Sequence, residues 1–275
     1  MNNSILARNN VKVTGNGKKP MLFAHGFGCD QTMWRYITPA FENDYQVIVF
    51  DYVGSGKSDL AAYHEGRYST LNGYALDILE ICEELNLRDV MFVGHSVSSM
   101  TGLLAAIKEP DYFAELILIA PSPRYLNEKG YVGGFDKTDV DRILDNMGKD
   151  YEGWANGAAP DVMKNPDRPD LSAELVQSFL SIKPSIARNF MAATFFTDNR
   201  KDLLKLKKPS LIVQTEDDRI VPIEVGDYLH AHLENSTLKV LKASGHYPHL
   251  SHPRETIRVM KAYLNTKDRQ KADIP

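Results

Sequence analysis

Short runs of apolar residues recur along the first half of the chain and again near its end. Seven of them are rich in β-branched and aromatic residues: 11–14, 20–25, 45–50, 90–94, 115–121, 209–215 and 237–241. Most are continuously apolar, which predicts strands buried on both faces of a parallel sheet. Segments with a helical period separate them, at 70–86, 97–109, 223–233 and 253–267. This alternation predicts an α/β fold with a mostly parallel sheet.

The region from about 123 to 207 breaks the alternation. It contains no clear strand pattern, and its helical patterns lie at 136–149, 150–157, 171–182 and 184–197. A helical insertion between two core strands is the simplest arrangement. We therefore expect a core formed by residues 1–122 and 208–275, with residues 123–207 inserted as a helical subdomain.

Composition and charge narrow the class of protein. Hydrophobic residues make up 43% of the chain and charged residues 25%, as in ordinary globular proteins. There are 32 Lys and Arg residues and 36 Asp and Glu residues, which gives a net charge of −4. This balance gives no reason to expect nucleic acid or an anionic membrane as a partner. The first residues hold no apolar stretch long enough for a signal peptide, and no run approaches the roughly 20 apolar residues of a membrane span. With only two cysteines, the chain is expected to be a cytoplasmic protein with reduced thiols.

One short motif suggests a nucleotide site. The stretch VIVFDYVGSGKSDL, residues 47–60, contains Gly56-Lys57-Ser58, the last three letters of a phosphate-binding P-loop. That pattern requires a second Gly five positions earlier, where this chain has Asp51. A carboxylate would repel a triphosphate, so the sequence argues against nucleotide binding.

A serine stands where one of the predicted strands runs into a helix. Gly94-His95-Ser96-Val97-Ser98 follows the run VMFVG, which resembles the nucleophile elbow G-x-S-x-G. Such a turn projects the Ser96 hydroxyl from the sheet edge, while the Val97 N–H at the helix start points toward developing negative charge. Ser98 replaces the second glycine of the pattern, so the motif alone also fits a serine that only caps a buried helix.

A nucleophilic serine needs a base and an acid that orients the base. Asp218 follows the run 209–215 and His246 follows 237–241, which gives the chain order serine, acid, histidine and places all three at one sheet edge. Glu216 and Asp217 are competing acids. We choose Asp218 because it stands four residues before Pro222, and we expect the other two to be solvated.

Three evenly spaced histidines, His246, His249 and His252, also raise the question of a metal site. Pro248 and Pro253 interrupt the segment, so we expect no regular face on which zinc ligands could converge. We therefore predict no metal and no cofactor, with His249 and His252 in packing or surface roles.

An oxyanion formed at Ser96 needs a second N–H donor besides Val97. His25-Gly26-Phe27-Gly28 follows an earlier strand, and glycines on both sides of Phe27 allow its N–H to face the site. A plain glycine turn is the alternative interpretation of this loop.

Together these residues resemble the α/β-hydrolase superfamily across essentially the whole chain. The segments HGFGCDQTMW, FDYVGSGKSD, RYSTLNGYALDILEICEELNL, VGHSVSS, PSPRYLN and GHYPHLSHP are similar to one group within it. This group comprises the RsbQ-type bacterial regulators of the sigma-B energy-stress response and the plant strigolactone and karrikin receptors. The resemblance implies a Ser96, Asp218 and His246 triad with a Phe27 and Val97 oxyanion hole, and it accommodates Ser98. It also implies that Asp51 and its glycines shape a turn below the active site, with Lys57 exposed.

The resemblance further implies that the insertion is a four-helix lid over a substrate pocket. It carries five large aromatic residues that could line the pocket or form lid core: Phe135, Trp154, Phe190, Phe195 and Phe196. We expect Phe135, Trp154 and Phe195 in the pocket. Because no charged residue is evident for holding a substrate anion, a small, mostly apolar ester or lactone is the expected substrate.

Two kinds of function follow. The first is a serine hydrolase that forms an acyl-enzyme. The second, implied by the resemblance, is a signalling module that binds or converts a small hydrophobic molecule and activates a partner PAS-domain phosphatase of the RsbP type. A purely metabolic carboxylesterase is a further alternative. Epoxide hydrolase and dehalogenase chemistry is disfavoured, because those enzymes need a carboxylate where Ser96 stands.

Overall fold

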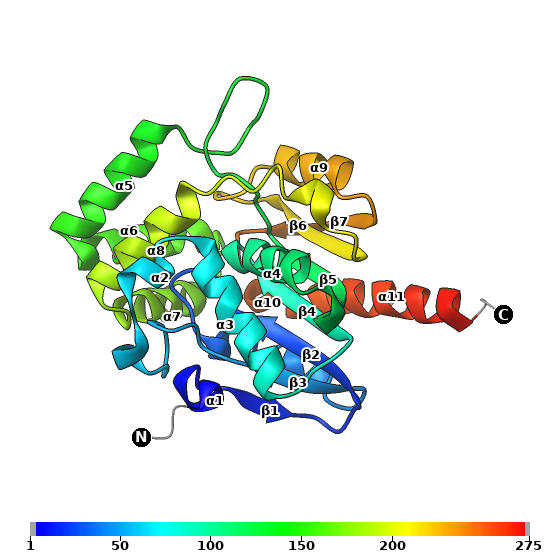
Figure 1. Cartoon of the computed structure of the whole chain (residues 1–275). Coiled ribbons are helices and arrows are strands. Elements are labelled where there is room, and N and C mark those ends of the chain that lie inside the picture. Colours follow the sequence, from blue (N-terminus) through cyan, green and yellow to red (C-terminus); the bar gives the residue numbers. More distant parts are fainter. Residues whose placement is uncertain (1–3, 273–275) are drawn as a thin grey trace.

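Seven strands form one sheet in the computed structural model, which describes residues 4–272 (Figure 1). The strands are β1 Lys12–Thr14, β2 Lys19–Ala24, β3 Tyr45–Val49, β4 Val90–His95, β5 Phe113–Ile119, β6 Ser210–Asp217 and β7 Ser236–Ser244. Their order is β1-β3-β2-β4-β5-β6-β7; β1 is antiparallel to β3 and every other neighbouring pair is parallel. Each strand coincides with one of the predicted runs, so the α/β prediction is confirmed.

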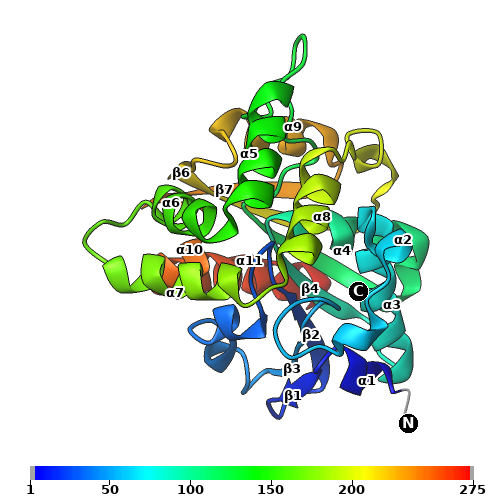
Figure 2. The same ribbon diagram turned by 90° about the vertical axis from the view of Figure 1, so that its left-hand side faces the viewer.

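Helices cover both faces of this sheet because each central strand buries both of its faces. Leu22 and Phe92 pack with α3 (Leu71–Glu84), α4 (Val97–Lys108) and α9 (Ile223–His232) in one apolar cluster. Their strand neighbours Met21 and Val93 point the other way, into a cluster with α11 (Pro253–Ala272). Figures 1 and 2 show the two helical layers on opposite sides of the strands. Because side chains alternate along a strand, a continuous apolar run fits this three-layer arrangement.

Four helices separate β5 from β6 and gather beyond one end of the sheet (Figures 1 and 2). They are α5 Lys137–Lys149, α6 Tyr151–Met163, α7 Pro169–Leu180 and α8 Pro184–Phe195. We call these four helices the lid.

Helix α6 continues past residue 157, where the sequence pattern predicted its end. An interior proline costs a helix about 3 kcal/mol, and Pro160 lies inside this one. However, Ala159, Val162 and Met163 are buried in an apolar cluster with residues of α7. Tertiary packing of this face therefore offsets the local penalty.

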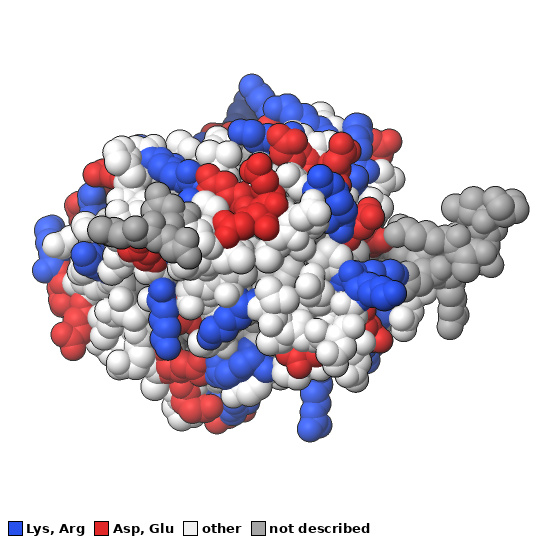
Figure 3. All heavy atoms as spheres, turned by 60° about the horizontal axis from the view of Figure 1, so that its bottom comes forward, with Lys and Arg blue, Asp and Glu red and all other residues white. Residues whose placement is uncertain are grey.

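The remaining elements are short. They are the helices α1 Ile5–Arg8, α2 Glu65–Tyr68 and α10 Pro248–Ser251 and the 3-10 turns η1 Gln31–Trp34, η2 Thr38–Ala40, η3 Leu60–Ala62, η4 Pro110–Tyr112 and η5 Leu203–Lys205. Within residues 4–272, no helix is both long enough and apolar enough to cross a membrane. Positive and negative side chains are interspersed on the face in Figure 3, and neither sign covers it.

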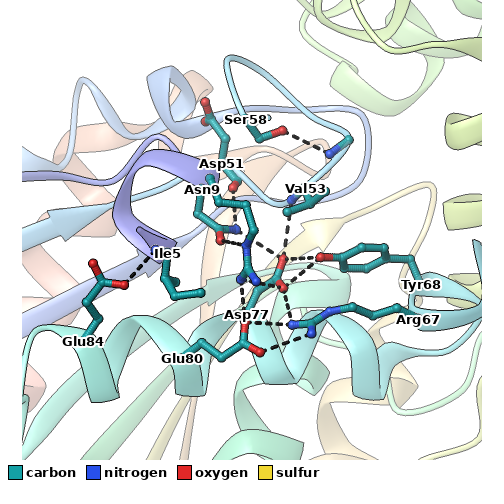
Figure 4. A network of polar contacts seen from close by, with 12 residues as sticks. Ile5, Asn9, Asp51, Val53, Ser58, Arg67, Tyr68, Asp77, Glu80 and Glu84 are labelled. Carbon is teal, nitrogen blue, oxygen red and sulfur yellow. Dashed lines mark hydrogen bonds and ion pairs between the residues drawn. The ribbon is translucent and has the colours of Figure 1, made fainter. Parts of the chain in front are cut away.

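A buried carboxylate fixes the start of the chain to the core (Figure 4). Asp77 of α3 is fully buried and pairs with Arg8 at 3.2 Å and Arg67 at 2.8 Å. It also accepts hydrogen bonds from the Tyr68 hydroxyl at 2.9 Å and the Asn9 amide at 3.2 Å. Burial raises the pKa of Asp77, and the two arginines oppose this shift. The network thus joins α1, α2 and α3.

The loop with the P-loop-like letters is organised by Asp51. Its buried carboxylate accepts hydrogen bonds from the N–H groups of Gln31 and Lys57, both at 2.9 Å, and from the Asn10 amide at 2.7 Å. Gly56 has φ +54°, and a Cβ there would lie 2.5 Å from Asp51 Oδ2. The Lys57 side chain is exposed. The glycines therefore serve a tight turn around a carboxylate.

Candidate active site

Ser96 occupies a strained turn between β4 and α4. Its backbone has φ 56° and ψ −126°, a conformation that typically costs a non-glycine residue about 1–3 kcal/mol. A Cβ at Gly94 would lie 2.7 Å from the Ser98 carbonyl oxygen, so the turn is too tight for a larger residue there. The Ser96 N–H donates to the Ile119 carbonyl of β5 at 2.8 Å. The sheet thus holds the turn and directs the hydroxyl outward.

Ser96, His246 and Asp218 form one hydrogen-bonded chain. His246 Nε2 lies 2.8 Å from Ser96 Oγ, and His246 Nδ1 lies 2.7 Å from Asp218 Oδ2. The other oxygen of Asp218 accepts from the N–H groups of Ile220 at 2.7 Å and Val221 at 3.1 Å. The structure therefore brings together the three residues that chain order had selected.

The environment of Asp218 distinguishes it from its acidic neighbours. Its side chain is fully buried, whereas Glu216 and Asp217 are exposed and Asp217 pairs with Lys164. An ionised Asp218 only accepts hydrogen bonds, so it requires the proton of His246 on Nδ1. This leaves the Nε2 lone pair facing the Ser96 hydroxyl, within the reach of a general base.

The His25–Gly28 loop lies beside the turn of Ser96. A Cβ at Gly26 would lie 2.5 Å from His95 Nδ1, so the backbone of Gly26 packs directly against the imidazole ring of His95. His25 donates from Nδ1 to the Gly26 carbonyl at 2.9 Å and accepts from the Tyr52 N–H at 3.2 Å. Burial lowers the pKa of His25, which agrees with this neutral form.

Two backbone N–H groups near Ser96 are available as donors, one on this loop and one at the start of α4. The Phe27 N–H has no acceptor within residues 4–272. Val97 is the first residue of α4, and the first N–H groups of a helix lack an intrahelical acceptor. These are the two groups predicted to hold an oxyanion, and the phenyl ring of Phe27 lines the same cavity as Ser96.

Ser98 explains the departure from the G-x-S-x-G pattern. It is fully buried, and its hydroxyl donates to the carbonyl oxygen of His25 and lies 3.1 Å from the Tyr52 hydroxyl oxygen. A glycine could not make these contacts. The serine therefore links the helix that follows Ser96 to the loop that carries Phe27.

A cavity of about 700 Å³ lies over Ser96 and His246, within the usual size of small-molecule sites. Phe135, Trp154 and Phe195 line it, as predicted. The other two aromatic candidates do not. Phe190 stacks on Tyr74 with ring centroids 4.2 Å apart, and Phe196 is 40% exposed.

Tyr125 is a lining residue that the sequence reasoning missed. Its hydroxyl oxygen lies 3.5 Å from Ser96 Oγ, and burial raises its pKa, so it remains a neutral hydroxyl. Its only signal in the sequence is its position shortly after β5, at the edge where the other site residues gather. Phe179, Met191 and Ile220 add further apolar lining.

Charged residues also line the cavity, although none was evident in the sequence for holding a substrate anion. Three cations and three acids line the cavity with the apolar residues: Arg142, Lys149, Arg219, Asp139, Asp150 and Asp161. Arg142 pairs with Asp139 at 2.5 Å and Arg219 with Asp161 at 3.3 Å. The side chains of these two pairs are between 39% and 70% exposed, so they lie where the cavity meets solvent.

In the histidine-rich segment the two prolines start helices, and His249 has the packing role expected for it. Pro248 and Pro253 each begin a helix, α10 and α11, because proline is favoured in the first turn. His249 is buried against Trp34 and His95, with ring centroids 4.7 and 4.4 Å away, whereas His252 is half-buried. Among the described residues no group of three or more His, Cys, Asp or Glu side chains could hold a metal ion.

Comparison with known proteins gives the family. The model of the Alpha/beta hydrolase family matches residues 21–259. The chain is 39% identical over 256 residues to Strigolactone esterase RMS3 of Pisum sativum, covering 92% of this chain and 95% of that protein. It is 37% identical over 261 residues to Karrikin insensitive 2 receptor CA of Petunia hybrida, covering 93% and 95%. A solved hydrolase from Oleispira antarctica superposes with a TM-score of 0.92 at 41% identity, covering 95% and 96%.

The chain therefore belongs to the alpha/beta hydrolase family. Within it, the chain is a homologue of plant proteins named as strigolactone esterases and karrikin receptors, and it is an enzyme of the ester-hydrolase type. The predicted resemblance to this plant group is thus confirmed, while the resemblance to the RsbQ-type regulators stays a prediction.

Proposed function

We propose that this chain is a serine hydrolase that cleaves small, mostly apolar esters or lactones through an acyl-enzyme. The observation that carries this proposal is the hydrogen-bonded chain from Ser96 Oγ to His246 Nε2 at 2.8 Å and from His246 Nδ1 to Asp218 Oδ2 at 2.7 Å. It has the roles and order of a catalytic triad.

In the first half-reaction, Ser96 Oγ attacks the carbonyl carbon while its proton passes to His246 Nε2. The N–H groups of Phe27 and Val97 hold the oxyanion, and each such donor typically contributes about 3 kcal/mol in the transition state. The C–O bond to the leaving group breaks, and the imidazolium returns the proton to that oxygen. Water then attacks the acyl carbon while His246 again takes a proton. The bond from that carbon to Ser96 Oγ breaks, the imidazolium returns the proton to Ser96 Oγ, and the free acid leaves.

The cavity supports the substrate class. Aromatic residues surround Ser96, among them Phe27, Phe135 and Phe195, and favour an apolar acyl or alcohol group. The Tyr125 hydroxyl, 3.5 Å from Ser96 Oγ, is placed to donate to an ester or lactone oxygen. The cavity volume of about 700 Å³ is that of a small-molecule site, so a polymeric substrate could not be fully enclosed.

Hydrolysis of p-nitrophenyl acetate by wild type and Ser96→Ala tests this reaction. The variant should lose at least about a hundredfold in kcat. Ser99→Ala is a matched control, because Ser99 is a buried serine of the same helix that bonds the Gly94 carbonyl and does not line the cavity. It should retain most of the activity, and circular dichroism should show all three proteins folded. Equal activity in wild type and Ser96→Ala would refute the assignment of Ser96 as the nucleophile.

The same site supports a signalling role, which we propose as the physiological use of the hydrolase. Two observations support this proposal: a relative at 37% identity is named as a receptor, and several segments of the chain resemble the RsbQ-type regulators. In this role the protein acts in the cytoplasm as a positive regulator of sigma-B stress signalling and activates a PAS-domain phosphatase of the RsbP type. Co-purification with such a phosphatase, using tagged wild type and Ser96→Ala, tests this. Absence of association alongside fast ester turnover would leave a metabolic carboxylesterase.

A further inference from the structure

The loop that carries His246 is held by the lid as well as by the core. The His246 N–H donates to the Val162 carbonyl, near the end of α6, at 2.9 Å. On the core side, His95 Nε2 donates to the His246 carbonyl at 2.8 Å, and the Thr215 hydroxyl donates to the Gly245 carbonyl at 2.9 Å. The backbone of the catalytic histidine is thus fixed between β4 and β6 on one side and α6 on the other.

The lid and this loop approach so closely that only glycine fits at the contact. Gly245 has φ +93°, and a Cβ there would lie 2.1 Å from the Met163 carbonyl oxygen. Lys164 ends α6 in the left-handed conformation, with φ 49° and ψ 31°. This C-cap turns the chain back so that the last carbonyls of α6 face the histidine loop.

One side chain spans the contact. The Asn165 amide nitrogen donates to the Met163 carbonyl at 2.6 Å and to the Ser244 carbonyl at 3.1 Å, two residues before His246. It therefore closes the turn after α6 and joins that turn to the end of β7. Asn165 is half-buried and does not line the cavity.

Two ion pairs reinforce the same contact from the acid side. Lys164 pairs with Asp217 at 2.5 Å and Asp161 pairs with Arg219 at 3.3 Å, on either side of Asp218. Their side chains are between 31% and 60% exposed, so solvent screens them. The half-buried Asn165 amide, which donates hydrogen bonds to two backbone carbonyls, therefore constrains this contact more strongly than the exposed ion pairs do.

We propose that Asn165 is a positioning residue for His246: it fixes the turn through which the Val162 carbonyl holds the histidine backbone. This inference rests on the proposed triad. A displacement of about 1 Å in a catalytic group can cost about a hundredfold in rate, so a partly released loop lowers the chemical step without altering the substrate pocket.

The test compares Asn165→Ala and Asn165→Asp with wild type in p-nitrophenyl acetate hydrolysis. Asn165→Ala should lower kcat about tenfold and leave KM within about twofold, because the side chain does not reach the cavity. Asn165→Asp has the same shape but presents a carboxylate oxygen to two carbonyl oxygens, so its loss should be larger. The matched control is Asn156→Ala, within α6, where an exposed amide donates to the Glu152 carbonyl of the same helix. This variant should behave as wild type.

A spectroscopic readout separates positioning from mere stabilisation. The proton shared by His246 Nδ1 and Asp218 gives a far-downfield resonance in proton NMR, which should shift or broaden in both Asn165 variants and remain in Asn156→Ala. Thermal unfolding of each variant shows that the protein measured is folded.

The outcomes distinguish this inference from the proposed function. An inactive Ser96→Ala together with unchanged kcat and an unchanged resonance in Asn165→Ala would overturn the positioning role alone, even if the melting temperature falls. Activity retained in Ser96→Ala would overturn both. An equal loss of kcat in Asn156→Ala would overturn the positioning role of Asn165, because the effect would then come from disturbing α6 as a whole.

Discussion

A buried histidine three residues after His246 should make the stability of this protein depend on pH. His249 is 1% exposed and packs between Trp34 and His95. Its Nδ1 has no hydrogen-bond partner within residues 4–272. Burial, with smaller contributions from the neighbouring His246 and Arg35, lowers the pKa of His249 to about 3.

The sign and size of the effect follow from linkage. Above pH 6.5 the histidine is neutral in both states, and its contribution to the free energy of unfolding is fully present. Between pH 6.5 and about 3 the unfolded chain binds a proton that the folded protein does not, so this stability is lost as the pH falls. At pH 5, about 1.5 pH units below the unfolded pKa, the loss is about 2 kcal/mol.

Other groups titrate in the same range, so the measurement needs a variant. Burial also lowers the pKa of His95, and arginine partners lower the pKa of Glu80, and both effects add to the loss on acidification. The raised pKa of Asp77 opposes them. Comparing wild type with His249→Gln removes the contributions that do not depend on His249, so the difference reports His249 together with its effect on His95.

Urea unfolding followed by tryptophan fluorescence at pH 7 and pH 5 gives the required free energies. Wild type should lose about 2 kcal/mol more than His249→Gln between the two pH values. His64→Gln, at an exposed histidine, is the matched control and should retain the wild-type dependence. An identical pH dependence in wild type and His249→Gln would refute the reasoning, because His249 would then titrate alike in both states.

Three further predictions follow from buried polar groups. Asp77→Asn leaves the buried ends of Arg67 and its partners without their carboxylate and should lower the free energy of unfolding by about 3 kcal/mol, measured by urea at pH 7; a change below about 1 kcal/mol would contradict the network. Ser98→Ala removes the bond to the His25 carbonyl and should lower kcat for p-nitrophenyl acetate severalfold with KM little changed; a wild-type kcat would exclude a role in holding the loop that carries Phe27. Burial raises the pKa of Cys82 to about 12, so a thiol reagent at pH 8 should react with it only on unfolding; rapid reaction in the native protein would contradict its burial.

The linear sequence determined where the strands lie and in which order the candidate serine, acid and histidine follow along the chain. Continuous apolar runs located all seven strands, because burial on both faces leaves few polar positions within a strand. Ser96, Asp218 and His246 were predictable because each follows a strand, and parallel strands present their carboxyl ends at one edge. The tight turns at Phe27 and Ser96 were also predictable from the glycines beside these residues, since such turns exclude larger side chains.

The tertiary structure alone decided which side chains meet across the lid. Helical periodicity did not predict that α6 continues through Pro160, because this continuation depends on the packing of its buried face against α7. It also did not predict that the Tyr125 hydroxyl oxygen lies 3.5 Å from Ser96 Oγ. It also gave no indication that the Val162 carbonyl holds His246, 84 positions further along the chain as numbered. The physical reason is that periodicity records only which face of an element is buried, whereas the partner of that face depends on how the lid helices pack over the strand ends.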